Sequence, residues 1–101
     1  MPRRLRLSTV RVLVADGRFA LTGRAQRHLV ARSWDFEKVA ECLCSLKRSD
    51  LHKSIPDPLR LGSRLDTYRP WMDGQRLYIK FTLDEEGDLY VLSFCRDGEH
   101  H

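Results

Sequence analysis

The stretch from Arg76 to Leu83 reads Arg-Leu-Tyr-Ile-Lys-Phe-Thr-Leu and alternates polar and apolar side chains throughout. Successive side chains of a β-strand point to opposite faces of a sheet, so this alternation predicts a strand with one buried and one solvent-facing side. The solvent-facing side is expected to carry Arg76, Tyr78, Lys80 and Thr82. An acidic turn over residues 84–88 follows, and residues 89–95 are predicted to return as the second strand of a hairpin.

Helical patterns precede this hairpin. The predicted elements are, in order, a helix over 7–15 with Ser8 as its N-cap, a short strand over 18–22, a basic helix over 24–32, a helix over 36–48 capped by Asp35 and a further helical turn from Ser49 to Ile55. Pro56 and Pro58 then favour an irregular loop up to residue 64. Residues 66–72 are predicted to form an edge strand, because Pro70 lacks the N–H that an interior strand needs.

This order of elements, α-β-α-α-β-β-β, predicts an α+β fold. Helices are expected to pack on one face of a small antiparallel sheet, leaving the opposite face partly exposed and cationic. The length of 101 residues suits one domain, residues 1–101, whose last residues, 96–101, are expected to fray. That length excludes a dinucleotide-binding domain with a separate substrate domain, a TIM barrel and a protein kinase.

Positive charge is concentrated in the N-terminal third. Residues 1–32 contain eight Arg and one Asp, and the whole chain has a formal net charge of +4. Such a protein usually binds an anionic partner, with phosphate as the leading candidate, although a well-solvated surface explains the charge equally well. No apolar stretch is long enough to cross a bilayer, so we expect a cytoplasmic protein without a membrane partner. The three cysteines and four histidines lack metal-ligand spacing, and neither a metal nor a cofactor is expected.

The solvent-facing side of the predicted strand suggests a function. Arg76, Tyr78 and Lys80 would follow one another at intervals of about 7 Å, which places two cations around an aromatic ring. Such a set can bind phosphate, stack on a base or donate a proton, but an ordinary solvated strand face has the same composition. Directly before Lys53, His52 titrates in the range useful for a catalytic base or acid. A solvated Lys and a half-buried surface His are the simpler interpretations.

Residues 68–71, Tyr-Arg-Pro-Trp, place two aromatic rings beside a cation. Stacking on RNA is one interpretation, but packing of Tyr68 and Trp71 in the core is favoured. The chain shows no catalytic triad order, carboxylate pair or phosphate-binding Gly loop. An enzyme built from Lys, Arg, Tyr and His would therefore act on a phosphodiester without a metal. RNA suits such a site, because its 2′-hydroxyl is an internal nucleophile that DNA lacks.

Several blocks in fixed order resemble the MqsR toxins of bacterial toxin–antitoxin systems. Residues 49–55, Ser-Asp-Leu-His-Lys-Ser-Ile, are similar to that family's Ser-Asp-aromatic-aromatic-Lys-Ser-Met segment, and residues 66–70 are similar to its Asp-x-Tyr-Arg-Pro. Residues 74–80, Gly-Gln-Arg-Leu-Tyr-Ile-Lys, resemble its Gly-Gln-x-Tyr-Leu-Lys run with one extra residue before the Tyr, and residues 91–94 resemble its final Val-Ser-Phe strand. The resemblance covers nearly the whole chain.

The resemblance implies a RelE-like fold and a metal-independent endoribonuclease. Such an enzyme cleaves mRNA at short GC-containing sites such as GCU, leaves a 2′,3′-cyclic phosphate and a 5′-hydroxyl, and is neutralised by an MqsA-like antitoxin. DNA would be contacted only indirectly, through the antitoxin. The family's catalytic Lys and Tyr fall on Lys53 and Tyr78, whereas its Gln and its C-terminal Lys fall on Leu65 and Cys95.

One hypothesis and two alternatives follow. The expected catalytic residues are Lys53, Tyr78 and His52, with Lys53 stabilising charge because an amine is protonated near pH 7. The residues expected to bind the RNA backbone are Arg69, Arg76, Lys80 and Arg96, although strand alternation places Arg96 on the opposite face from Cys95. The first alternative is a catalytically weakened RNA-binding regulator on the same scaffold, suggested by Leu65 and Cys95. The second is a protein-interaction domain whose basic face binds an acidic antitoxin.

Overall fold

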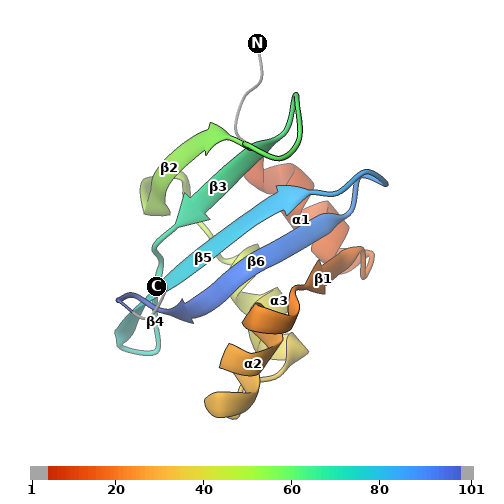
Figure 1. Cartoon of the computed structure of the whole chain (residues 1–101). Coiled ribbons are helices and arrows are strands. Elements are labelled where there is room, and N and C mark those ends of the chain that lie inside the picture. Colours follow the sequence, from red (N-terminus) through yellow and green to blue (C-terminus); the bar gives the residue numbers. More distant parts are fainter. Residues whose placement is uncertain (1–4, 99–101) are drawn as a thin grey trace.

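The computed structural model describes residues 5–98 and shows a curved sheet with three helices (Figure 1). In chain order the elements are α1 (Leu7–Ala15), β1 (Phe19–Leu21), α2 (Gly23–Ala31), α3 (Phe36–Cys44), the 3-10 helix η1 (Arg48–Asp50), β2 (Leu51–Pro56), β3 (Arg64–Tyr68), β4 (Trp71–Met72), β5 (Gln75–Leu83) and β6 (Leu89–Arg96). The predicted α+β class is confirmed, and so is the hairpin of β5 and β6 that the alternating pattern indicated.

The sheet has the strand order β1-β6-β5-β3-β2, and the short β4 pairs with β5 beside this path. All neighbouring strands run antiparallel except β1 and β6, which are parallel. The predicted sheet was wholly antiparallel. No hairpin connects β1 to β6, so no tight turn imposes the antiparallel direction on that pair.

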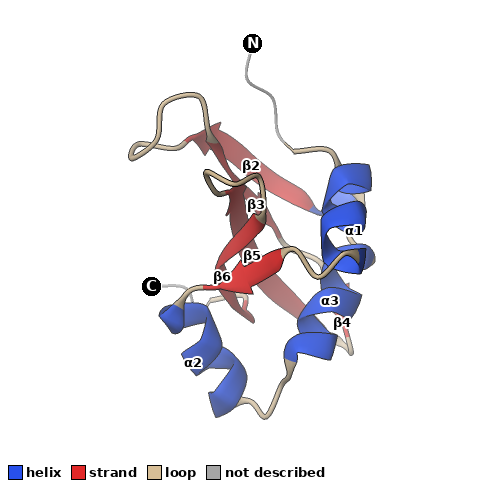
Figure 2. Cartoon of the chain, turned by 90° about the vertical axis from the view of Figure 1, so that its right-hand side faces the viewer, coloured by secondary structure: helices blue, strands red, loops and turns tan. Residues whose placement is uncertain are grey.

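The helices occupy two places around the sheet. Figure 2 shows α1 and α3 together on one side, as predicted, whereas α2 stands on the other side at the β6 edge. The core lies between the sheet and the paired helices, and its fully buried members include Val10, Val39, Ile79 and Phe81. On the core side of β5, Leu77, Ile79 and Phe81 all belong to the hydrophobic cluster, as predicted. Burial does not alternate along β5, however, because Tyr78 and Thr82 on the opposite side are also buried.

Side-chain caps fix two of the helix starts. The Asp35 carboxylate accepts a hydrogen bond from the Lys38 amide at 2.9 Å, which confirms the predicted cap of α3. Thr22 caps α2 through the Ala25 amide at 3.1 Å. The predicted cap at Ser8 is wrong, because α1 begins at Leu7, so that Ser8 lies inside the helix, and its N-cap position is Arg6, which provides no side-chain cap.

Residues 49–55 do not form the predicted helical turn. The chain leaves the short η1 at Asp50 and enters β2, which pairs along its length with β3. Pairing with β3 satisfies the backbone groups that a short isolated helix would have left partly unpaired, so tertiary context overrides the local pattern.

The predicted edge strand over residues 66–72 is also wrong. β3 lies inside the sheet between β2 and β5, and it ends at Tyr68, before Pro70. Pro70 therefore needs no place in a ladder, and its carbonyl accepts a hydrogen bond from the Leu77 amide at 2.8 Å. β2, not β3, forms this edge of the sheet.

The predicted C-terminal tail and the predicted loop after β2 can also be compared with the structure. Arg96 still belongs to β6, and the last part of the predicted tail, residues 99–101, lies outside the described residues. An irregular loop over residues 57–63 joins β2 to β3, as the two prolines indicated. Between residues 5 and 98, no helix has the length and apolar character needed to cross a membrane.

Candidate active site

Two of the predicted site residues share one row across the sheet. Lys53 on β2 pairs with Thr67, Thr67 pairs with Lys80 on β5, and Lys80 pairs with Ser93. Cross-strand partners lie on the same face of a sheet, so all four side chains emerge from one side. Adjacent strands are about 4.8 Å apart, which places the Cα atoms of Lys53 and Lys80 roughly 10 Å apart. We call this side, opposite α1 and α3, the open face; its central residues are Lys53, Thr67, Tyr78, Lys80 and Ser93.

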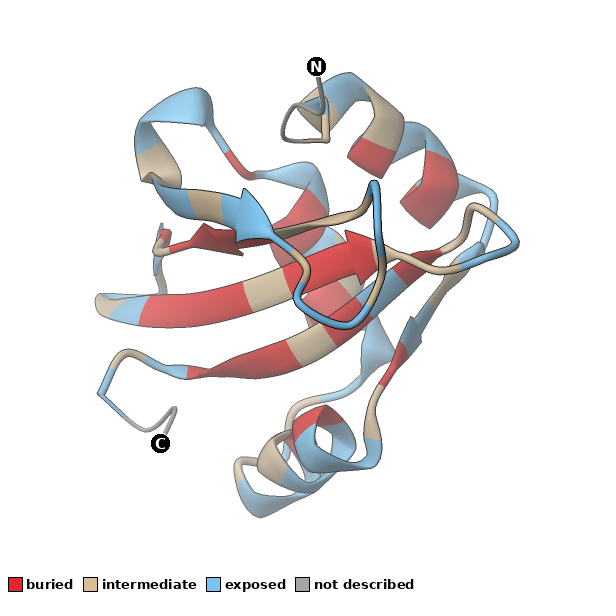
Figure 3. Ribbon diagram, turned by 45° about the horizontal axis from the view of Figure 1, so that its top comes forward, coloured by how far each residue is buried: buried red, intermediate tan, exposed pale blue. Residues whose placement is uncertain are grey.

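Tyr78 lies on the open face but is not exposed there. It precedes Lys80 by two residues on β5 and pairs with Cys95. The residue is only 8% exposed, so the expectation of a solvent-facing tyrosine is wrong. Tyr78 is nevertheless not a member of the hydrophobic core cluster. Side chains on the open face must therefore cover its ring, and Figure 3 shows most of β5 as buried.

Arg69 is one of the groups beside Tyr78. Continuing the register of β3 and β5 beyond Tyr68 places Arg69 opposite Tyr78. Its Nε and Nη2 atoms donate to one carboxylate oxygen of Asp97 at 3.2 and 2.5 Å. Its backbone N–H donates to the Asp50 carbonyl at 2.8 Å. The guanidinium thus joins the ends of β3 and β6, and two of its nitrogens already donate to Asp97.

Arg76 and Trp71 form a cross-strand pair at the start of β5. The Arg76 guanidinium lies over the Trp71 ring, 5.4 Å from its centroid, and also donates to the Arg69 carbonyl at 3.1 Å. Trp71 is 66% exposed, so the prediction that it packs in the core is wrong. The same prediction is confirmed for Tyr68, which is fully buried and stacks on Phe81 with the ring centroids 5.6 Å apart.

His52 occupies an irregular position next to Lys53. The register of β2 against β3 shifts between Leu51 and Lys53, so His52 is the extra residue of a β-bulge. Both His52 and Lys53 are exposed. Bulges often redirect a side chain at a functional site, and this one lies on the strand that carries the candidate cation.

A buried hydrogen-bond network holds β2 in place behind these two residues. Ser54 donates to the Asp66 carboxylate at 2.5 Å, and the Leu5 amide donates to the other Asp66 oxygen at 2.7 Å. Arg64 donates to both the hydroxyl and the carbonyl of Ser54, at 2.9 and 2.7 Å. Lys53 therefore projects from an edge strand that is tied to the body of the protein.

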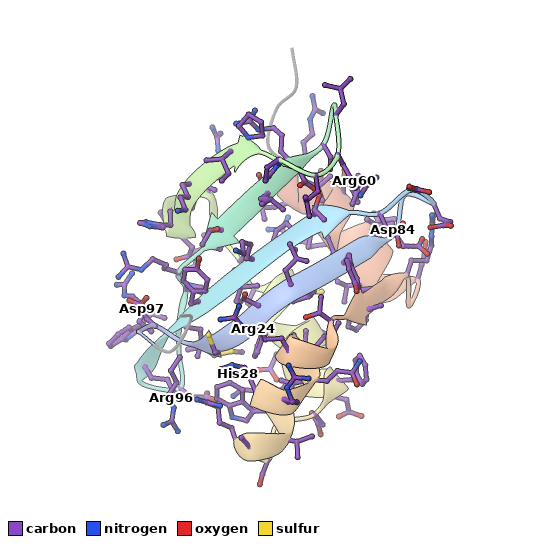
Figure 4. The ribbon with its side chains drawn as sticks, viewed as in Figure 1. Arg24, His28, Arg60, Asp84, Arg96 and Asp97 are labelled. Carbon is purple, nitrogen blue, oxygen red and sulfur yellow. The ribbon has the colours of Figure 1, made fainter. Side chains whose placement is uncertain are left out.

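The structure does not bring Arg96 into the row of Lys53 and Lys80. Arg96 pairs with Leu77, whose side chain belongs to the core side of the sheet, as strand alternation predicted. A different arginine reaches the open face instead. Figure 4 shows Arg24, from the first turn of α2, lying over β6. The sequence signal for this residue was the concentration of arginines in residues 24–32, which gave no reason to prefer one of them.

The donor atoms of this face suit an anion better than a cation. Across residues 5–98, His, Cys, Asp and Glu side chains form no group of three that could hold a metal ion. The open face offers ammonium and guanidinium groups with a phenol among them. This set can neutralise the charge of a phosphate and donate protons to its oxygens.

The chain matches a known protein family over nearly its whole length. The family described as "Motility quorum-sensing regulator, toxin of MqsA" matches residues 3–96. The chain belongs to this MqsR toxin family. An MqsR toxin is the toxin of a toxin–antitoxin pair, and its partner is an MqsA-like antitoxin. A search of curated proteins found no match.

In this MqsR toxin the two departures from the family pattern both fall on the open face. Leu65 pairs with Ile55 on β2. It lies two residues before Thr67 on β3, so its side chain is on the same face of the sheet. Cys95 pairs with Tyr78 and is buried. An apolar side chain and a thiol thus stand where the resemblance places a Gln and a Lys.

Proposed function

We propose that this protein is a metal-independent endoribonuclease that cleaves mRNA to inhibit translation and growth. The observation that carries the proposal is the row that joins Lys53 to Lys80 on the open face, with Tyr78 one step further along β5. Two ammonium groups and a phenol then surround the position where a backbone phosphate would lie. A preference for short GC-containing sites such as GCU, and neutralisation by the MqsA-like antitoxin, follow from the family resemblance.

The reaction uses the 2′-hydroxyl of the substrate as its nucleophile. The 2′-oxygen forms a bond to phosphorus while the bond between phosphorus and the 5′-oxygen breaks, giving a 2′,3′-cyclic phosphate and a 5′-hydroxyl. One proton must leave the 2′-oxygen, and one must reach the departing 5′-oxygen. His52 in its neutral form is the candidate acceptor of the first proton, since a neutral imidazole nitrogen can take up a proton. Tyr78 is the candidate donor of the second.

The lysines and arginines would stabilise the negative charge of the RNA backbone and of the transition state. Lys53 is placed at the phosphate as a fixed positive charge that stabilises the pentavalent transition state. Lys80, Arg69 and Arg76 would bind neighbouring phosphates, although Arg69 already contacts Asp97 and Arg76 already contacts Trp71. Arg96 remains a candidate for the RNA backbone beyond the end of β6, outside the central row.

The test is cleavage of a GCU-containing RNA in the presence of EDTA. We expect the wild type to produce fragments ending in a 2′,3′-cyclic phosphate. Replacing Lys53 by Ala, or Tyr78 by Phe, should lower the rate by about a hundredfold or more, because each removes a group acting on the transition state. Lys47→Ala is the matched control, since Lys47 is an exposed lysine before η1, and it should cleave like wild type. Undiminished cleavage by both site variants would refute the assignment.

Leu65 and Cys95 support a second candidate function. With neither a hydrogen-bonding side chain nor a permanent cation at these two open-face positions, the protein could bind RNA and cleave it weakly or not at all. RNA binding by the wild type without a cyclic-phosphate product would favour this regulator. Cleavage that increases in a Cys95→Lys variant would show instead that the chemistry is present and only attenuated.

A further inference from the structure

We propose that Trp71 is a base-stacking residue that holds an unpaired RNA base next to the cleaved phosphodiester. The inference rests on the proposed function and names a substrate contact for it. Trp71 is 66% exposed, which is unusual for so large an apolar side chain, and the fold gives it no core role.

The position of Trp71 links it to the candidate active site. Its cross-strand partner is Arg76, which lies two residues before Tyr78 on β5. Two residues of a strand span about 7 Å, so the indole extends the row Tyr78–Lys80 by one step on the same face. A nucleotide whose phosphate lies between Lys53 and Tyr78 can therefore place a neighbouring base on this ring.

The ring is held in a fixed orientation. β4 and β5 are joined by the two-residue turn Asp73-Gly74, in which both residues have positive φ angles of 53° and 76°. These angles are typical of the type I′ turn that favours a tight hairpin. The Asp73 carboxylate forms an ion pair with Lys38 of α3, which ties the turn to the helical layer. A preorganised ring loses little conformational freedom when a base stacks on it.

Charge around the ring favours a nucleic acid over a protein partner. The Arg76 guanidinium lies over the indole, 5.4 Å from its centroid, and the same side chain donates to the backbone carbonyl of Arg69. An aromatic ring accompanied by a guanidinium group is a usual way of binding single-stranded RNA, since a base stacks while its phosphate contacts a cation.

Fluorescence of a single tryptophan tests the proposal directly. The chain has two tryptophans, and Trp34 is half-buried and packs edge-on against Phe94. A Trp34→Phe variant therefore reports on Trp71 alone. The probe is a short GCU-containing RNA with a 2′-deoxy nucleotide at the cleavage position, which removes the nucleophile and allows equilibrium binding. We expect saturable quenching, and we expect it to be lost when the base beside the cleaved phosphate is replaced by an abasic site.

Affinity measurements with variants complete the test. Trp71→Ala should weaken RNA binding roughly tenfold to a hundredfold, and Trp71→Phe should recover most of this loss. Phe36→Ala is the control, because Phe36 is another exposed aromatic residue but lies on α3, behind the sheet. With an abasic probe, wild type and Trp71→Ala should bind equally.

The outcomes separate this inference from the proposed function. Normal cleavage and affinity in Trp71→Ala, with no quenching of Trp71, would overturn the stacking role and leave the ribonuclease intact. Quenching by RNA without any cleavage would refute the ribonuclease and leave the stacking contact. If RNA fails to quench Trp71 but the antitoxin shields it from acrylamide, the ring serves the protein interface and the proposal is wrong.

Discussion

At the scale of single residues, Tyr78 illustrates what burial does to a candidate proton donor. The residue is almost fully buried but lies outside the hydrophobic cluster, so the packing around it restricts its ring. A donor restricted in this way would lose little entropy when a phosphate arrives, which is the advantage of a preorganised site.

Cys42 provides a prediction about reactivity at this scale. Burial in α3 raises the pKa of its thiol from 9.0 to about 12, because the thiolate would lose its hydration there. Native protein treated with iodoacetamide at pH 8 should therefore be labelled at the exposed Cys44 long before Cys42. Peptide mapping by mass spectrometry measures this order. Equal labelling rates in the native state would contradict it.

The Cys42 thiol should also make the free energy of unfolding depend on pH. The folded protein binds the thiol proton more tightly than the unfolded chain does. The stabilisation of the folded state that results is fully present below about pH 9 and is lost between pH 9 and about 12. The difference in unfolding free energy between wild type and Cys42→Ala should therefore shrink as the pH rises above 9. Urea titrations of both proteins at pH 7 and pH 10 provide the measurement, and a constant difference would contradict the expectation.

At the scale of elements, the position of β2 depends on Asp66. This carboxylate is 2% exposed and accepts hydrogen bonds from Ser54 of β2 and from the Leu5 amide before α1. One side chain thus connects the edge strand, the interior strand β3 and the N-terminal segment. The Asp of the family-like motif in residues 66–70 has a structural task, since it holds the strand that presents Lys53.

Replacing Asp66 by Ala tests this structural role. Hydrogen bonds to a charged group contribute about 1.5–3 kcal/mol each, and the variant leaves two donors without their acceptor. We expect a loss of roughly 2–4 kcal/mol in unfolding free energy, measured by urea denaturation. Asp57→Ala is the control, because Asp57 accepts from the Leu59 amide in an exposed loop and should cost less than about 1 kcal/mol. Equal losses in both variants would contradict the role of Asp66.

At the scale of the whole molecule, the positive net charge and the position of the paired helices together determine where cations are available. The net charge is +4, and the two paired helices cover one side of the sheet, so the cations of β2 and β5 remain available on the other. A cationic face attracts RNA over distances comparable to the Debye length, which is about 8 Å at physiological salt. Added salt weakens this attraction.

The salt dependence of RNA binding is the prediction that belongs to this scale. For single strands, the logarithm of the binding constant falls with the logarithm of salt concentration by about 0.7 for each phosphate that is neutralised. Lys53→Ala should reduce the magnitude of that slope by about 0.7, whereas Lys47→Ala should leave it unchanged. Titrations of a non-cleavable RNA from 50 to 300 mM salt, taken as rough limits, would measure both slopes. An unchanged slope in Lys53→Ala would show that Lys53 contacts no phosphate.

Local patterns in the sequence determined the elements that depend on near neighbours. The alternation from Arg76 to Leu83 identified β5, and Asp35 identified the start of α3, because a strand pattern and a helix cap involve residues only a few positions apart. The grouping of Lys53 with Lys80 was different. These residues are 27 positions apart, and only the pairing of β2 with β3 and of β3 with β5 brings them into one row. The sequence predicted both as site residues, yet it placed Lys53 on a helix and left Tyr78 exposed. The burial of Tyr78 and the exposure of Trp71 depend on which strands become neighbours. That choice is made by tertiary packing, which balances long-range hydrogen bonds and apolar burial over the whole chain.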